Sequence, residues 1–150
     1  MSYLVFSQEP KGPFETERLA SHAARFFRAK LERLETGPDW VRVRLTGASF
    51  DAELTLRARD VTRDDLQDAK GAEARGKAAG MSALAERCSQ IWEIGAAEGS
   101  SPNEAAYLAM SGICASVALG PVLPPDHSTL FGGKKAETAL RSLYGGPHGR

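Results

Sequence analysis

The sequence predicts an α+β fold, in which a small sheet containing an antiparallel hairpin is packed on one face by helices. The segments 40–46 and 50–59 alternate strictly between apolar and polar residues, as half-buried strands do. A β-favouring apolar segment at 3–6 and a helical stripe precede them, which gives a β-α-β-β start. After residue 60 the apolar spacing is helical, so the C-terminal half is predicted to be all helical.

Length and charge set the broad class. The chain has 150 residues, the usual size of one domain, and we expect a single core. Within it we distinguish a β-α-β-β part at 1–60, a helical part at 61–144 and a flexible tail at 145–150. Lysine and arginine together number 19, as do aspartate and glutamate, so no net field attracts nucleic acid or an anionic membrane.

The cysteines and histidines match no pattern that is typical of a disulfide or a metal site. Cys88 and Cys114 both fall in segments predicted as apolar helices, where a free thiol behaves as a small hydrophobic side chain. Residues 1–19 lack the basic and then apolar pattern of a secretory signal. We therefore expect buried, reduced thiols and a cytoplasmic protein. The three histidines share no metal-ligand spacing, so we predict no metal site and no cofactor.

The first strand and the first helix follow from simple patterns. Residues 3–6 are apolar and are followed by Pro10 and Pro13, which suits a short buried strand. Apolar residues then recur at intervals of three and four from 14 to 34, which predicts one amphipathic helix. The positions of this stripe are Leu19, Ala23, Phe27, Leu31 and Leu34.

The hairpin is the most sharply predicted element. With a turn at 46–49, the apolar residues Val43 and Leu45 lie opposite Ala52 and Phe50. The same register places Arg44 opposite Asp51 and Arg42 opposite Glu53, so every cross-strand pair is complementary. A slip of one residue in the register would turn the apolar residues of one strand to solvent. The predicted register is therefore strongly favoured over such a slip.

Four helical segments are predicted after the hairpin. Thr62 and Asp65 form a capping box that starts a helix, but Gly71, Gly76 and Gly80 predict a broken or loosely packed segment. A helical stripe runs from 81 to 95. Ser101, followed by proline and glutamate, predicts the start of a helix that ends near residue 119. This helix is apolar all round, so we expect it to be buried, and it is too short for a membrane span. The last helix is predicted at 134–144.

One segment matches the spacing of a phosphate-binding loop. Gly71 and Gly76 are followed by Lys77 in the pattern G-x-x-x-x-G-K, but Ala78 stands where a metal-binding hydroxyl is required. No buried strand directly precedes the segment, as such a loop needs. Small residues that allow close helix packing are the favoured interpretation.

The 121–135 loop offers two weak sites. Gly132 and Gly133 lead into a helix beside Lys134 and Lys135, an arrangement that can hold an anion at exposed backbone N–H groups. In the same loop, Asp126, His127 and Ser128 place an acid, a base and a hydroxyl side by side. Adjacent side chains usually diverge, so a hinge and a turn remain the simpler explanations.

The outer face of the hairpin offers a binding surface. It carries a tryptophan and four arginines: Trp40, Arg42, Arg44, Arg57 and Arg59. The predicted pairs neutralise two of these arginines, which leaves mainly Arg57 and Arg59 free. Trp92 borders an apolar stripe and becomes a candidate partner contact if it is exposed.

Function is inferred only by exclusion. Without a metal set, a nucleotide loop or a nucleophile motif, we expect a non-catalytic protein that binds another protein, as an inhibitor, immunity protein or adaptor does. Nucleic-acid and membrane binding are not favoured, and a homo-oligomer is compatible with the sequence. The alternative is a small enzyme, or a protein that binds a small molecule or anion, with its site at the 121–135 loop.

Overall fold

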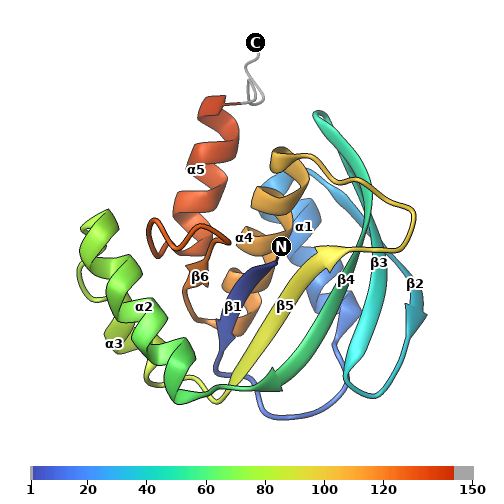
Figure 1. The fold of residues 1–150 in the computed structure, drawn as a ribbon. Helices are drawn as coiled ribbons and strands as arrows, with labels where there is room; N and C mark the ends of the chain where they lie inside the picture. The colour runs from blue at the N-terminus through green and yellow to red at the C-terminus, as the bar shows by residue number, and fades with distance from the viewer. Residues whose placement is uncertain (1, 144–150) are drawn as a thin grey trace.

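The computed structural model describes residues 2–143, and the predicted tail at 145–150 lies outside the described residues. The elements, in chain order, are β1 (Tyr3–Ser7), α1 (Thr16–Phe27), β2 (Lys30–Thr36), β3 (Trp40–Gly47), β4 (Phe50–Asp60), α2 (Arg63–Gly76), α3 (Met81–Ala85), β5 (Gln90–Ala96), α4 (Glu104–Ala118), β6 (Val122–Leu123) and α5 (Gly133–Leu143). The α+β class and the C-terminal helices are confirmed (Figure 1).

All strands join one antiparallel sheet. The strand order is β2-β3-β4-β5-β1-β6, so the sheet has six strands rather than the three expected from the β-α-β-β start. The two extra pairings on the N-terminal strand come from the C-terminal half, since β5 and β6 flank β1. The first strand is therefore interior, and the two halves of the chain share one sheet.

The predicted hairpin is present as β3 and β4, but its register differs by two residues. Val43 lies opposite Leu54, and Arg44 opposite Glu53. Gly47 lies opposite Phe50, whose ring covers the glycine so closely that a Cβ there would collide with it. The turn therefore shortens to residues 48 and 49. A shift of two keeps each side chain on its predicted face, because the pleat repeats every two residues.

The long helix predicted over 14–34 was wrong in its second half. Helix α1 ends at Phe27, and Arg28 takes the left-handed backbone conformation with φ 50°. Residues 30–36 then form β2, an edge strand that pairs with β3 and places Leu31 opposite Leu45. Ladder hydrogen bonds and burial of Leu31 outweigh the helix propensity of this segment, which is high because leucine, lysine, arginine and glutamate all favour helices.

The helix predicted over 81–95 was also wrong in its second half. Helix α3 covers only Met81–Ala85, and Gln90–Ala96 forms the strand β5 between β4 and β1. Ile91 and Trp92 are both buried but face opposite sides of the sheet. A strand buried on both faces has a continuous apolar sequence, which periodicity alone does not separate from a helix.

Helix α2 confirms its predicted start and corrects its predicted weakness. Both hydrogen bonds of the capping box between Thr62 and Asp65 are present. The helix then continues without a break through Gly71 to Gly76, and it ends where Lys77 takes a left-handed conformation with φ 54°. The glycine-rich segment is therefore interrupted only after residue 76.

Helix α4 is the buried central helix that the sequence predicts. Its N-cap is Asn103 rather than Ser101, since the Asn103 side chain accepts a hydrogen bond from the backbone N–H of Ala106 at 2.9 Å. It packs against β1, α1 and α5, and Met110, Ile113 and Cys114 are fully buried. Over residues 2–143, no helix combines the length and the apolar character that a membrane span requires.

The sheet has a core on each face. The inner core lies under α1, α4 and α5 and contains the inward residues of the hairpin. The outer core lies under α2 and α3 and is smaller: Phe6, Ile91, Leu123 and Leu130 meet short side chains such as Ala69. Helices therefore cover both faces, although the sequence predicted helices on one face only.

Candidate functional site

The outer face of the sheet is covered over only part of its width. Helices α2 and α3 lie beside β1 and β6, far from β2 (Figure 1). In the described part of the chain, no helix lies over the outer surfaces of β2, β3 and β4, and we call this area the open face. Its outward residues on the hairpin include Trp40, Arg42, Arg44, Thr46, Asp51, Glu53, Thr55 and Arg57.

Ion pairs organise most of the open face. Arg42 donates one hydrogen bond to Glu53 at 2.9 Å and another to Glu35 of the edge strand at 3.0 Å. Arg44 binds Asp51 in a bidentate manner, with both N–O distances at 2.9 Å. The hydrogen bonds from Arg44 lower the pKa of Asp51 below its usual value.

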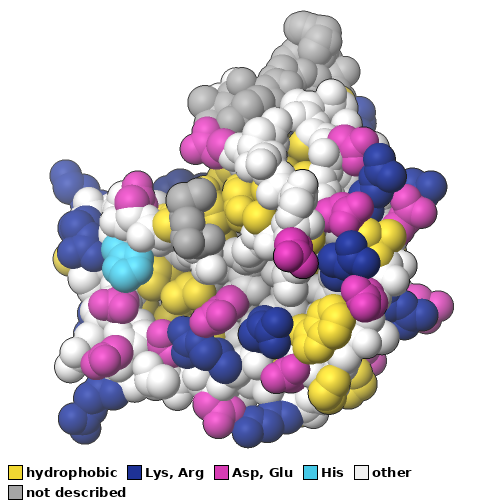
Figure 2. Space-filling view, turned by 45° about the vertical axis from the view of Figure 1, so that its right-hand side comes forward, with side chains coloured by type: hydrophobic (Ala, Val, Ile, Leu, Met, Phe, Trp, Pro, Cys, Tyr) yellow, Lys and Arg dark blue, Asp and Glu magenta, His cyan; other side chains and the backbone are white. Residues whose placement is uncertain are grey.

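These contacts confirm the predicted charge partners in a different geometry. In the observed register Arg44 and Asp51 are not directly opposite, and neither are Arg42 and Glu53. Each arginine reaches diagonally across the hairpin, which its length allows. In Figure 2, basic and acidic side chains alternate over much of the visible surface, without a continuous area of one charge.

The side chains of Trp40 and Arg57 make no ion pair and no hydrogen bond among the described contacts of the open face. They lie directly opposite each other at the start of β3 and within β4. Trp40 is half-buried, and its indole lies so close to Gly37 that any side chain at 37 would collide with it. Arg57 is exposed, and within the described part of the chain it makes no ion pair.

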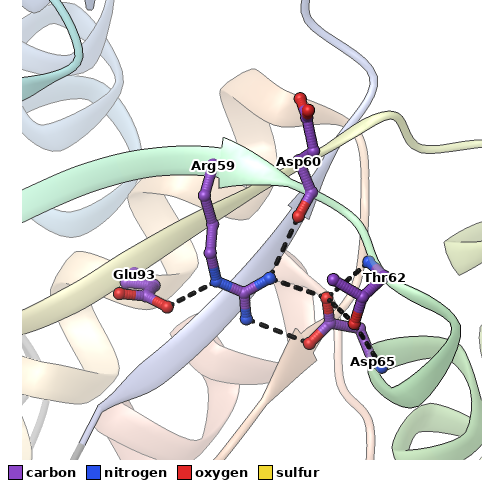
Figure 3. Close-up of polar contacts among 5 residues, drawn as sticks. All are labelled: Arg59, Asp60, Thr62, Asp65 and Glu93. Atoms are coloured by element: carbon purple, nitrogen blue, oxygen red, sulfur yellow. Dashed lines mark hydrogen bonds and ion pairs between the residues drawn. The ribbon is translucent and has the colours of Figure 1, made fainter.

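Arg59 corrects the prediction that it is free. Its guanidinium donates two hydrogen bonds to Asp65, at 2.7 and 3.0 Å, and one to Glu93 at 2.6 Å (Figure 3). It also donates to the backbone carbonyl of Asp60 at 3.0 Å. Asp65 accepts further hydrogen bonds from the N–H and hydroxyl of Thr62. This network joins β4, β5 and the start of α2, so its evident role is to fix α2 on the sheet.

Burial and hydrogen bonding act in opposite directions on Asp65. Burial alone would raise its pKa, but the hydrogen bonds from Arg59 and Thr62 outweigh burial and lower the pKa below its usual value. Glu93 was not predicted as part of this network, because its segment has the apolar spacing of a helix. The signal that would have found it is the sequence 90–96, which also fits a strand next to β4.

Trp92 does not meet the condition of exposure that would make it a partner contact. It is 6% exposed, and its ring packs edge-to-face on Phe14, with ring centroids 5.1 Å apart. It lies on the inner face, opposite to the open face. Of the six residues predicted to contact a partner, the structure therefore gathers Trp40, Arg42, Arg44 and Arg57 on one surface.

Three of the four predicted anion-binding residues line one groove. Gly132, Lys134 and Lys135 border an open groove of about 420 Å³, whose other walls include Met81 and Phe131. Gly133 does not line it, because it packs against the Ser116 hydroxyl of α4. The glycine pair does lead into a helix, since α5 begins at Gly133.

The described contacts of Asp126 and His127 involve the side chain of Asp126 and the backbone of His127. Asp126 accepts a hydrogen bond from the N–H of Ser128 at 3.0 Å, and hydrogen bonds from Ser128 lower its pKa. His127 has a left-handed backbone with φ 54°, and its carbonyl accepts a hydrogen bond from Arg75 at 2.7 Å. No described hydrogen bond or ion pair connects His127 with Lys134.

The remaining motifs do not assemble into a site. Gly71–Gly76 is a helical segment of α2, which is not the loop that a nucleotide phosphate needs. Cys88 and Cys114 are unpaired and buried on opposite faces of the sheet. Burial raises the pKa of the Cys88 thiol to about 11, and burial also raises the pKa of the Cys114 thiol above its usual value. Between residues 2 and 143, no three His, Cys, Asp or Glu side chains cluster so as to hold a metal.

Comparisons with protein families, with curated proteins and with solved structures give no match for this chain.

Proposed function

We propose that the protein acts without catalysis, by binding another protein through the open face. The observation that carries this proposal is the pair Trp40 and Arg57 on the open face, over which no helix lies among residues 2–143. Tryptophan and arginine are the residues that most often dominate interface energies. The partner would place an apolar group against Trp40 and a carboxylate on Arg57.

The balance of charge favours a protein over a nucleic acid as the partner. Arg42 and Arg44 are already paired with carboxylates, so a polyanion would have to displace those ion pairs. A protein surface can instead present charges of both signs that continue the alternating pattern. An inhibitor, an immunity protein or an adaptor would each use such a surface.

The edge strand supports recognition through side chains rather than by strand addition. Strand β2 carries charged residues along its length and has an irregular register between Arg33 and Glu35, where Leu34 is 41% exposed. Charges and bulges at a sheet edge discourage pairing with another strand. The partner would therefore contact the face of the sheet.

Affinity capture with variant baits tests the proposal. The wild-type chain is compared with the double variant Trp40→Ala, Arg57→Glu, and with a control double variant, Phe26→Ala, Arg87→Glu. Phe26 and Arg87 are exposed and lie outside the open face. We expect a protein that is recovered with the wild type and the control but is lost with the open-face variant. A set of captured proteins that is identical for all three baits would contradict the proposal.

A second candidate is binding of an anion in the groove beside α5. It is supported by Lys134 and Lys135, which line the same groove. Titration with inorganic phosphate, followed by backbone amide NMR, tests it against the variant Lys134→Ala, Lys135→Ala. Shifts at residues 132–135 that disappear in the variant are expected, and unchanged spectra of the wild type would reject this candidate.

We place the protein in the cytoplasm, and this assignment is part of the proposal. Two unpaired buried thiols suit a reducing compartment.

A further inference from the structure

The groove beside α5 combines apolar walls with two lysines. It runs between the connection of α2 to α3 and the segment that leads into α5, and its volume is about 420 Å³. In Figure 1 this segment, which follows β6, lies between α5 and the pair α2 and α3. The apolar residues that line the groove are Ala78, Ala79, Met81, Leu130 and Phe131.

The sheet holds the floor of the groove in place. Phe131 exchanges two backbone hydrogen bonds with Val122 of the edge strand β6, at 2.7 and 3.1 Å. Leu130 belongs to the outer core and Phe131 to the inner core, so the groove lies where the two cores meet. Both side chains are buried, whereas Met81 is half-buried and has a flexible side chain. An apolar group that enters the groove therefore meets a fixed floor and an adaptable wall.

The charge at the rim of the groove is positive. Lys134 and Lys135 line it, and both are exposed. The lysine ion pairs among the described residues involve Lys11, Lys30 and Lys70, so neither rim ammonium group is paired. None of the described residues that line the groove is acidic. A carboxylate at the rim would therefore meet two ammonium groups without displacing an ion pair.

The size of the groove favours a small molecule over a macromolecule. Sites for small molecules commonly have volumes of about 300–1,000 Å³, a range that includes this groove. A specific protein interface takes about 20–30 residues from each partner, whereas eight described residues line the groove. A wholly polar anion would leave the apolar walls in water, so walls and rim together favour an anion with an apolar tail.

We propose that this groove binds a small carboxylate with a hydrocarbon tail, the class to which medium-chain fatty acids belong. The carboxylate would lie between the ammonium groups of Lys134 and Lys135, and the tail would pack against Met81 and Phe131. This inference rests on the second candidate function, anion binding beside α5, and adds the apolar part of the ligand. It is independent of the open face, because the groove lies at the β6 edge of the sheet and β2 forms the other edge.

Octanoate is the first probe, and butanoate is the matched control with the same carboxylate and a shorter tail. Each is titrated into the full chain while NMR follows the backbone amides of residues 130–135 and the methyl group of Met81. Burial of one methylene raises affinity about fourfold, so we expect octanoate to bind at least tenfold more tightly than butanoate. Absence of shifts at millimolar octanoate, or equal affinity for the two acids, would overturn the inference.

Paired lysine variants locate the carboxylate. The double variant Lys134→Ala, Lys135→Ala should weaken octanoate binding at least tenfold. The control double variant Lys11→Ala, Lys30→Ala removes the same charge at exposed positions outside the groove and should bind octanoate like the wild type. An equal loss in both variants, or no loss in either, would contradict the placement of the carboxylate.

A polar substitution in the wall locates the tail. Met81→Gln should reduce the preference for octanoate over butanoate, because it replaces an apolar group by an amide of similar length. Leu119→Gln introduces the same amide at a position that is 60% exposed and lies outside the groove, and it should leave the preference unchanged. A preference that survives in Met81→Gln would show that the tail does not lie in the groove.

Phosphate and lipid vesicles separate this inference from its alternatives. Shifts with inorganic phosphate, together with equal affinity for octanoate and butanoate, would overturn this inference and leave the anion candidate in place. Unchanged spectra with phosphate and with both acids would reject the two together. Binding to phosphatidylglycerol vesicles without binding of octanoate would also overturn the inference, because the groove would then recognise a membrane surface.

Discussion

The two helical layers of this protein are attached to the sheet by different kinds of interaction. The inner layer buries long apolar side chains, such as Leu56 and Met110, against the whole width of the sheet. The outer layer covers only the side near β1 and β6, and it contributes mostly alanine to its core. Polar contacts from Arg59 to Asp65 fix α2 in place. The outer layer therefore covers only part of its sheet face, and among the described residues the open face carries no helix.

Truncation of a core residue should have the largest effect, and it should differ between the layers. Leu56→Ala removes a fully buried side chain of the inner core and should cost about 2–5 kcal/mol of unfolding free energy. Leu66→Ala in α2 removes a partly buried side chain and should cost less, about 1 kcal/mol. Urea unfolding measures both. Equal losses would mean that the two layers contribute alike.

Removal of Arg59 should have the next largest effect. Arg59→Ala leaves Asp65 buried without its charged partner and should cost about 1–3 kcal/mol. Arg44→Ala is the matched control on the open face, where the ion pair is half-exposed and screened by solvent, so its removal should cost clearly less. If the two substitutions had the same effect in urea unfolding, the network of Figure 3 would not be what holds α2.

The two thiols allow the local stability of the two helical layers to be compared, since one thiol lies in each core. Cys88 is 8% exposed under the outer layer, and Cys114 is fully buried under the inner layer. We expect a disulfide reagent at pH 8 to label Cys88 at least tenfold faster, because the outer layer opens locally more easily. The variants Cys88→Ser and Cys114→Ser show which thiol gives the fast phase of labelling and which gives the slow phase. Faster labelling of Cys114 would reverse the assigned order of stability.

Acid should weaken the outer layer through Asp65. Its pKa is lower in the folded protein than in the unfolded chain, so this group stabilises the fold above about pH 4. That contribution is lost as the pH falls toward the folded pKa. We expect unfolding free energy to decline less between pH 4 and pH 2.5 in Asp65→Asn than in the wild type. Parallel pH profiles would show that Asp65 does not contribute in this way.

Sequence patterns predicted this fold best where local spacing and tertiary packing agree. The hairpin and α4 carry the same periodicity that their burial requires, and both are present. Residues 30–34 and 90–95 were assigned to helices because leucine, isoleucine and tryptophan recur there at helical intervals. Their strand structure depends on pairing with β3, β4 and β1, which are distant partners that local patterns do not reveal.

The candidate sites show the same limit. The arginines of the open face were placed correctly because strand alternation fixes which side they occupy. The engagement of Arg59 with Asp65 and Glu93 was not foreseen, since it depends on how α2 and β5 approach β4.

Site-specific photo-crosslinking tests the central claim, that the open face is the surface that binds a partner, most directly. A photoreactive residue at Thr55, which lies opposite Arg42 on the open face, is compared with one at exposed Ala24 of α1 in cells that produce the protein. The account predicts a protein adduct from position 55 that disappears with Arg57→Glu and no such adduct from position 24. An adduct from position 24 alone, or one from position 55 that survives Arg57→Glu, would contradict the claim.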